Sequence, residues 1–232
     1  MMVYVSRRGS DLSVPETWEK HNWERPYVFL KKLETDYSQG RHDFQNHRYL
    51  LDKLVSGYNL KHAISRRSFT SVAEHELPAS VLDALLRCLY QALTQETHLF
   101  AGVVTHGVQG WDDAAWLLDH TPRALKRSDR ASDTEVVAKI IQGQGWASGK
   151  GITVLLGINW QFAIDAFVEP DIAYARALLD VGRVGHALLL EGQHHGLASR
   201  MTPAVHEETA SQMLRLSEER DVLYAIRLVF PG

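Results

Sequence analysis

The sequence has one cysteine, no long apolar run and no marked excess of charge of either sign, and each shortage excludes a class of protein. Cys88 stands alone, so the chain has no disulfide framework, no thiolate zinc site and no CxxC redox pair, and a reducing compartment fits it. The formal net charge is −3 and the basic residues are dispersed, which argues against binding of duplex nucleic acid.

Apolar segments of membrane length are also missing. No run approaches the roughly 20 residues that a bilayer crossing needs, and the first residues lack the hydrophobic segment of a signal peptide. We therefore expect a soluble, cytoplasmic protein that does not contact membranes. A length of 232 residues is enough to bury a full core and is most simply one domain with an N-terminal extension.

The N-terminal extension, residues 1–60, is rich in aromatic and charged residues. Two amphipathic helices are predicted in it, at Glu16 to Leu33 with an interruption at Pro26, and at His47 to Leu60. Such helices need a surface to cover. They pack on their own domain in one interpretation, and wrap a second subunit or bind a partner or peptide in the other.

Residues 61–232 form the main domain, and four segments in it have the composition of β-strands. The Ile152 segment is apolar throughout, which is typical of a central strand. A glycine-containing stretch, residues 107–111, predicts a hairpin between the first two strands. The predicted strands are His98 to Val108, Ala114 to Leu118, Ile152 to Trp160 and Val222 to Phe230.

Helices are predicted between these strands, which makes the fold α+β, with a mostly antiparallel central sheet covered by helices. Pro78 to Leu93 is amphipathic, and a capping box at Ser132 to Glu135 begins another helix. Thr121 to Arg130 reads as a basic, polar connection. Thr202 as N-cap and Pro203 at the first helical position predict a last helix that ends near Leu216.

The chain is organised around a helix that begins near Asp171 and ends at Gly196. Leu178 belongs to its predicted buried stripe. Gly182, Gly185 and Gly192 lie inside it, and each lowers helix stability by about 1 kcal/mol relative to alanine. Close approach of another backbone would offset that loss, in a packed core, in a dimer interface, or beneath a flat cofactor. If the interface is the reason, replacing Gly185 with leucine overpacks it.

Two segments resemble a known family. Leu178-Leu179-Asp180-Val181-Gly182, followed by an apolar run and Gly196-Leu197, is similar to the core helix of the nitroreductase superfamily, particularly its SagB-type dehydrogenase branch (azoline oxidase-like). Ser65-Arg66-Arg67-Ser68 is similar to the arginine–serine segment of that family. The resemblance covers the chain from about residue 60 onward and implies bound FMN, a homodimer and redox chemistry.

The resemblance also implies which residues contact the cofactor. Arg66, Arg67 and Ser68 match the positions that bind the FMN phosphate, and a guanidinium fork and a hydroxyl suit phosphate oxygens. Without the resemblance, paired arginines are more often a solvated charge pair. Further cofactor contacts are assigned after the core helix, at Gly196, Leu197 and Arg200.

Three departures from the family pattern weaken that assignment. Thr70 stands where the family usually has a basic residue, and Thr94 to His98 lacks the proline–serine–glycine loop that contacts flavin. Phe167 to Glu169 stands where azoline-oxidising members have a lysine–tyrosine pair.

The resemblance therefore does not assign the residues that act as acid and base. Glu169 as base and Tyr174 as acid are the candidate catalytic pair, although a carboxylate at a helix start and a packed tyrosine are more ordinary roles. No metal site is expected, because the adjacent His194 and His195 point in different directions on a helix.

Two functions follow from these residues. The first is a flavin-dependent oxidoreductase of SagB type, which oxidises a heterocycle or backbone in a peptide-derived natural product or a small molecule. The second is a flavin-less scaffold or binding subunit that partners an active biosynthetic enzyme or a peptide. Binding of FMN separates them.

Overall fold

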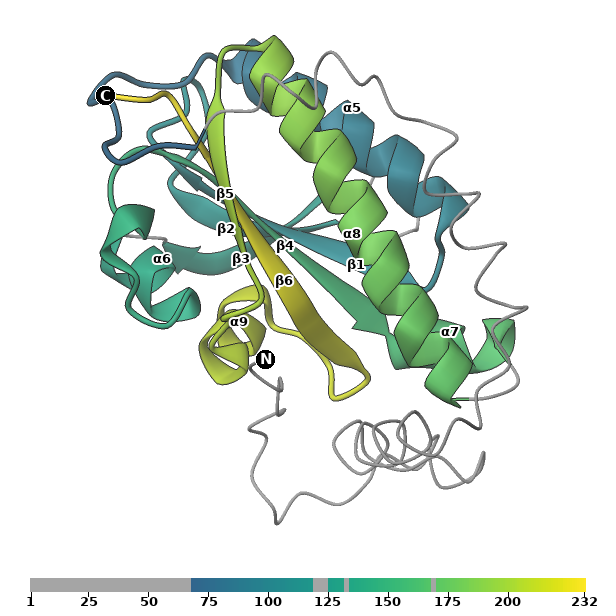
Figure 1. Cartoon of the computed structure of the whole chain (residues 1–232). Helices are drawn as coiled ribbons and strands as arrows, with labels where there is room; N and C mark the ends of the chain where they lie inside the picture. Colours follow the sequence, from purple (N-terminus) through teal and green to yellow (C-terminus); the bar gives the residue numbers. More distant parts are fainter. Residues whose placement is uncertain (1–67, 119–124, 132–133, 168–169) are drawn as a thin grey trace.

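The computed structural model describes residues 68–118, 125–131, 134–167 and 170–232, and the predicted helices of residues 1–60 lie outside these ranges. The described residues form a six-stranded sheet with helices on both faces (Figure 1). Every strand pair in it is antiparallel, in the order β3-β2-β1-β4-β6-β5. The predicted α+β fold with an antiparallel central sheet is confirmed.

The four predicted strands are all present. They are β1 (Leu99–His106), β2 (Ala114–Leu118), β4 (Gly151–Asn159) and β6 (Arg220–Val229). β4 lies between β1 and β6 and all nine of its residues are buried, which explains its continuous apolar sequence. β1 and β2 form the predicted hairpin.

Two pairs of helices cover the sheet. Helices α5 (Ala79–Gln95) and α8 (Pro170–His194) pack on one face, against Val154 and Ile226 among others. Helices α6 (Thr134–Ile140) and α9 (Glu207–Leu214) pack on the other, against side chains such as Phe100 and Leu155. Among the described helices, none has the length and hydropathy that a membrane crossing requires.

The polar connection predicted at Thr121 to Arg130 is wrong where the structure describes it, because Leu125–Ala131 is strand β3. β3 lies at the edge of the sheet and pairs only with β2 among the described strands. An edge strand tolerates charged residues, and the Arg127 guanidinium lies 5.6 Å from the Trp116 ring of β2. The sequence of β3 therefore lacks the alternation of apolar residues by which a strand is predicted.

The helix predicted from Thr202 begins too early. Residues Ala198–Thr202 are strand β5, which pairs with β6, and α9 starts only at Glu207. The Thr202 hydroxyl accepts a hydrogen bond from the Ala204 amide at 3.0 Å, which closes a local turn instead of capping a helix. His206 is the actual N-cap of α9.

A short helix that the sequence did not predict follows β4. Helix α7 (Trp160–Ala166) is capped by Asn159, whose side chain accepts from the Gln161 amide at 3.2 Å. The Trp160 indole donates to Asp221 Oδ2 at 2.7 Å and fixes the start of this helix on β6.

The glycines of α8 have different surroundings. A Cβ at Gly185 would lie 3.1 Å from Ile226 and Met201, and one at Gly192 would lie 2.6 Å from Leu228. Side chains of β5 and β6, rather than another backbone, therefore approach these two positions. Gly185 packs on its own sheet, so the prediction that its replacement reports on a dimer interface is wrong.

The opposite side of α8 is open to solvent. Apart from its own helix backbone and chain neighbours, no atom of the described residues lies within 4 Å of a Cβ at Gly182, and Leu178 is 43% exposed. The prediction that Leu178 belongs to the buried stripe is wrong, because it lies to one side of the face that Val181 and Val184 direct at the sheet.

Candidate functional site

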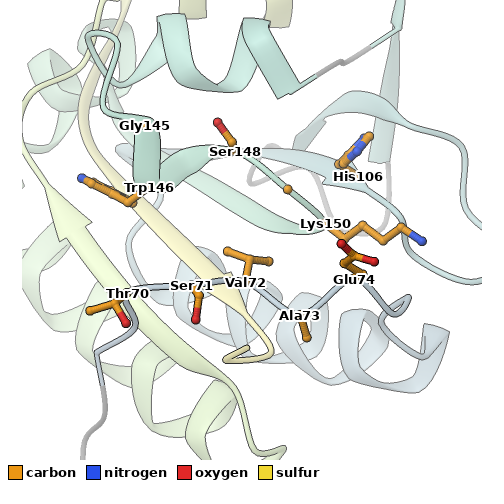
Figure 2. Close-up of a pocket in the computed structure, with 11 residues that line it drawn as sticks. Thr70, Ser71, Val72, Ala73, Glu74, His106, Gly145, Trp146, Ser148 and Lys150 are labelled. Carbon is orange, nitrogen blue, oxygen red and sulfur yellow. The ribbon is translucent and has the colours of Figure 1, made fainter.

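A pocket of about 590 Å³ opens between three segments that are distant in the sequence (Figure 2). One wall is the segment before α5, the second is the glycine-rich turn before β4, and the third is the end of β1. Polar and apolar groups alternate around it. Its lining residues are Thr70, Ser71, Val72, Ala73, Glu74, His106, Gly145, Trp146, Ser148, Gly149 and Lys150.

The first wall is fixed by the last residues of the chain. The Ala73 amide donates to the Phe230 carbonyl at 2.9 Å, and the Gly232 amide donates to the Ser71 carbonyl at 3.2 Å. The Ser71 hydroxyl also donates to the Gly232 carbonyl, at 3.1 Å. This two-way pairing holds the Ser71 segment extended beside the end of β6.

The second wall is anchored from below by Arg227 of β6. Its guanidinium donates to the Thr153 hydroxyl at 3.0 Å and to the Gly149 carbonyl. Burial lowers the pKa of Arg227 to about 10, so the side chain is still cationic at neutral pH. A Cβ at Gly151 would lie 2.9 Å from Arg227 Cζ, which is why glycine stands there.

Two of the predicted cofactor segments meet beside this pocket. Phe69, the residue after Ser68, is buried in a small cluster with Ala198 and Val229. The Arg200 guanidinium lies 5.3 Å from the Phe69 ring and 5.4 Å from the Trp146 ring, and Trp146 lines the pocket. The fold thus brings the exposed Ser68 and Arg200 to the same region, while their roles toward a cofactor stay predictions.

Gly196 and Leu197 have a structural explanation of their own. Gly196 has φ of +77° and ends α8, with the Leu197 amide donating to the Gly192 carbonyl at 2.9 Å. Leu197 is buried in the core below the helix. The end of the helix explains why glycine and leucine stand at these positions even if no ligand binds there. Their contact with a cofactor stays a prediction.

The remaining predicted residues divide into two groups. Arg66, Arg67 and Glu169 lie outside the described residues. Tyr174 is buried in α8, with its ring stacked on Trp160 at 6.2 Å. Burial and the nearby carboxylates of Asp221 and Glu207 raise the pKa of Tyr174 to about 12, so it is neutral at ordinary pH. It is not among the residues that line the pocket, and its catalytic role stays a prediction.

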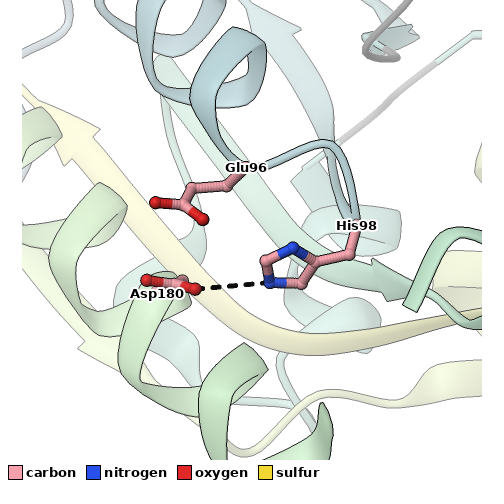
Figure 3. Close-up of side chains that lie close together, drawn as sticks. All are labelled: Glu96, His98 and Asp180. Carbon is pink, nitrogen blue, oxygen red and sulfur yellow. Dashed lines mark ion pairs between the residues drawn. The ribbon is translucent and has the colours of Figure 1, made fainter. Parts of the chain in front are cut away.

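A second cluster of ionisable groups is buried between α5, β1 and α8 (Figure 3). His98 Nε2 lies 3.3 Å from Asp180 Oδ2, and Arg176 Nε donates to the same oxygen at 2.5 Å. Arg183 donates to Glu96 Oε1 at 2.8 Å. Burial alone would raise the pKa of Asp180, but the bonds from His98 and Arg176 outweigh it and lower that pKa.

Glu96, His98 and Asp180 place three possible metal ligands within 4.8 Å of one another. Two guanidinium groups already contact the carboxylates, because Arg176 Nη2 also lies 3.7 Å from Glu96 Oε2. A metal ion here would add charge next to two cations. We therefore interpret the cluster as a structural ion network that joins α5 to α8.

This network explains the unusual segment after α5. Where the resembling family has a flavin-contacting loop, residues 94–98 instead send Glu96 and His98 into the protein interior. His98 also meets Phe167 edge to face, with the ring centroids 5.2 Å apart. The departure at Phe167 and the departure at residues 94–98 thus belong to one packed arrangement.

None of the residues that line the pocket was among the site residues predicted from the sequence. Lys150, Trp146 and His106 occur singly, outside any motif, and only the fold brings them together. One signal was available for His106, because the predicted hairpin has His106 directly before its turn and Asp113 directly after it.

No protein-family profile and no curated protein matches this sequence. Solved structures do match its fold. A candidate nitroreductase from Anabaena variabilis ATCC 29413 has a TM-score of 0.63 and 19% identity over 74% of this chain. The match spans only 38% of the length of that protein. Nitroreductase A from Vibrio parahaemolyticus has a TM-score of 0.52 and 14% identity, over 75% of this chain and 67% of its own.

A third match extends further along this chain. A chain of the Escherichia coli microcin synthetase McbBCD complex with truncated pro-MccB17 bound has a TM-score of 0.58 and 13% identity. The match covers 96% of this chain and 99% of that one. These identities establish the architecture and leave the activity open. The protein therefore has a nitroreductase-like fold.

Proposed function

We propose that the protein is an FMN-dependent oxidoreductase of SagB type and that the pocket of Figure 2 holds the flavin. The observation that carries the proposal is the position of this pocket. It lies in a nitroreductase-like fold, directly after Ser68 and beside the Trp146 ring on which Arg200 packs. The phosphate-binding residues inferred from the sequence would then lie at its rim.

The lining residues suit a flat, anionic cofactor. The volume falls within the roughly 300–1,000 Å³ of small-molecule sites. Trp146, Val72 and Ala73 supply an apolar wall for an aromatic ring system. The Ser148 hydroxyl and the ammonium group of Lys150 are donors suited to ring carbonyls and phosphate oxygens, and the Glu74 carboxylate is an acceptor suited to a ring N–H.

Lys150 is the pocket residue whose position the structure explains best. A Cβ at Gly107 would lie 2.5 Å from Lys150 Cγ and 2.6 Å from its Cδ, so the lysine stem packs across the bare Gly107 backbone. Gly107 also has φ of +63°, which favours glycine. The stem is thereby held in the pocket wall, where the positive charge of the side chain would favour an anionic ligand beside the negative charge of Glu74.

Bound FMN would supply a hydride acceptor, and the chain would bind and orient it. In this proposal Ser68, with Arg66 and Arg67 before it, contacts the phosphate. Trp146 forms a wall beside the rings, and Lys150 offers a positive charge at their polar edge.

The proposed substrate is a peptide-derived molecule whose heterocycle or backbone is oxidised. Its support is the likeness to a chain of the microcin synthetase complex, which has a truncated peptide precursor bound. That match covers 96% of this chain, against 74% to 77% for the nitroreductases compared with it in fold. A partner biosynthetic enzyme belongs to the same proposal.

The open side of α8 supports a homodimer. Ile172 is 46% exposed and Leu178 is 43% exposed. Gly182, in the middle of the helix, has no side chain and would let another chain approach the helix closely. Exposed large apolar side chains next to a glycine suit a second copy of the same helix. We propose that two chains meet along this side.

The visible spectrum of the full chain tests the proposed function. The protein is purified, incubated with excess FMN and passed through a desalting column, and a flavin band that elutes with the protein supports the oxidoreductase. Heat-denatured protein treated in the same way is the control for adsorption. A colourless protein fraction at high FMN would contradict the proposal and favour the flavin-less scaffold.

A further inference from the structure

A histidine–aspartate pair stands at the end of β1 and lines the pocket. His106 Nδ1 lies 2.9 Å from Asp113 Oδ2, and the His106 side chain is 22% exposed. The imidazole belongs to the pocket lining, opposite the segment that contains Glu74 (Figure 2). The lining also contains two charged residues, Glu74 from the segment before α5 and Lys150 from the glycine-rich turn.

One oxygen of the aspartate accepts a backbone hydrogen bond, and the other faces the imidazole. Asp113 Oδ1 accepts from the Gly107 amide at 2.8 Å, while Oδ2 faces the imidazole. The carboxylate therefore closes the hairpin between β1 and β2 and reaches back to the residue before the turn. The hydrogen bond from the Gly107 amide to Oδ1 therefore orients the carboxylate so that Oδ2 faces the imidazole.

The loop that carries Asp113 is itself anchored. The buried Thr105 hydroxyl donates to the Asp112 carbonyl at 2.8 Å, and the Trp116 indole donates to that hydroxyl at 3.1 Å. On its other side, the Leu77 amide donates to the Gly107 carbonyl at 2.9 Å, and the Gln109 amide donates to the Leu77 carbonyl at 2.8 Å. The pair thus rests on a rigid hairpin.

The contact of His106 Nδ1 with Asp113 Oδ2 is short at 2.9 Å but is not aligned as a hydrogen bond. A lone pair on Nδ1 would face the carboxylate oxygen and be repelled by it, so we expect the neutral ring to carry its proton on Nδ1. The neutral ring then has its lone pair on Nε2, the nitrogen that does not face the aspartate. A base that an acceptor holds in one tautomer is a recurrent arrangement for proton transfer.

We propose that His106 is the catalytic base of this pocket and that Asp113 is its positioning residue. The inference rests on the proposed oxidoreductase function and names a residue for it that the sequence did not. Tyr174, the acid predicted from the sequence, is buried in the core, whereas His106 lies where a substrate in the pocket would meet it.

The chemistry balances as follows. Converting a C–N or C–C single bond to a double bond removes a hydride from one atom and a proton from its neighbour. Bound FMN would supply the acceptor for the hydride, and His106 Nε2 would take the proton as the electron pair of the broken bond forms the double bond. The resulting imidazolium is stabilised by Asp113, and water then removes the proton.

The tautomer of His106 can be measured without any cofactor. Nitrogen-15 NMR of the labelled full chain is expected to show His106 protonated on Nδ1 at neutral pH. Asp113→Asn should invert it, because the amide oxygen must still accept from the Gly107 amide and the NH2 group then donates to His106 Nδ1. Asp112→Asn is the matched control, since Asp112 pairs with Arg127 at 2.6 Å.

A second readout asks whether Nε2 is available to a ligand. Diethyl pyrocarbonate acylates unprotonated imidazole nitrogen, and mass spectrometry locates the product on individual histidines. His106 should react in the unmodified protein and in Asp112→Asn, and lose this reactivity in Asp113→Asn. A structural hairpin contact would not predict this loss.

The outcomes separate the two proposals. An Nε2-protonated His106 in the unmodified protein, an unchanged tautomer in Asp113→Asn, or an unreactive His106 would each overturn the catalytic base. Protection of His106 from acylation by added FMN supports both proposals. The expected tautomer and reactivity without FMN protection would support the base and contradict the flavin site.

Discussion

Asp180→Asn removes the negative charge at the centre of the buried ion network while keeping the shape of the side chain. Asp180 is 3% exposed and accepts from Arg176 at 2.5 Å, with His98 at 3.3 Å from the same oxygen. Asparagine carries no charge, so Arg176 and His98 stay buried beside a weaker hydrogen-bond acceptor. Glu96 still contacts Arg176 and Arg183, so the network is damaged and not abolished.

The expected loss of unfolding free energy is about 3 kcal/mol at pH 7. Breaking a buried ion pair costs about 3–5 kcal/mol, and the lower end applies because the amide oxygen still accepts from Arg176. In a chain of this length each kcal/mol lowers Tm by roughly 2–4 °C, which gives a decrease of about 6–12 °C.

The effect depends on pH in a defined direction. The pKa of Asp180 in the folded protein lies below the ordinary value of 3.8. Its ionised form therefore stabilises the fold above that value, and the contribution is lost as the pH falls through the lowered pKa. Asparagine does not titrate, so the stability difference between the two proteins is full at pH 7 and shrinks below about pH 4.

Differential scanning calorimetry at pH 7 and at several values below pH 5 measures both effects. Asp83→Asn is the matched control, because Asp83 is an exposed residue of α5 and its replacement should change Tm little. If Asp180→Asn matched the control at pH 7, or if the difference stayed constant down to pH 3, the network would not stabilise the fold as described.

Two further predictions concern α8. Gly192→Ala should destabilise the protein by about 1–3 kcal/mol, because the added Cβ would lie 2.6 Å from Leu228. Gly182→Ala meets no side chain among the described residues of its own chain, so in the monomeric Leu178→Asp background it should stabilise the helix by up to about 1 kcal/mol. Equal effects of the two substitutions in urea unfolding would contradict the packing of this helix. Light scattering should give twice the monomer mass for the unmodified protein and the monomer mass for Leu178→Asp, and a monomer in both cases would contradict the proposed dimer.

The central part of the fold could be predicted because the apolar composition of its strands reflects their burial. β4 is buried on both faces and is apolar throughout, and β1 and β6 flank it with similar composition. β3 and β5 lie at the two edges of the sheet, where burial does not select apolar residues. In β5 the Thr202-Pro203 pair also imitates a helix start, so local sequence preference pointed to the wrong element.

The candidate site was only partly accessible from the sequence. Ser68 and Arg200 were predicted because they belong to segments that resemble a known family, and the fold brings those segments together through Phe69 and Trp146, while their contact with a cofactor stays a prediction. Lys150 and His106 could not be found in that way. Their common location depends on the glycine-rich turn and the end of β1 meeting across the pocket, which no local pattern encodes.

The buried ion network was also not predictable from local sequence patterns. Glu96, His98 and Asp180 come from segments far apart in the sequence, and each alone resembles an ordinary polar residue near a helix end. Residues 94–98 lack the proline and glycine of the loop that the resemblance predicts. The physical reason, the pairing of these side chains with Arg176 and Arg183, required the packing of α5 against α8.

The dissociation constant of FMN for Lys150→Met tests the central claim most directly, because methionine keeps the stem that packs on Gly107 and removes the charge. A charge-assisted bond contributes about 1.5–3 kcal/mol, so affinity should fall roughly tenfold to a hundredfold relative to the unmodified protein. Lys139→Met, an exposed substitution on α6, should bind as the unmodified protein does. Quenching of flavin fluorescence gives the three constants, and equal constants for all three proteins would contradict the assignment of this pocket to the flavin.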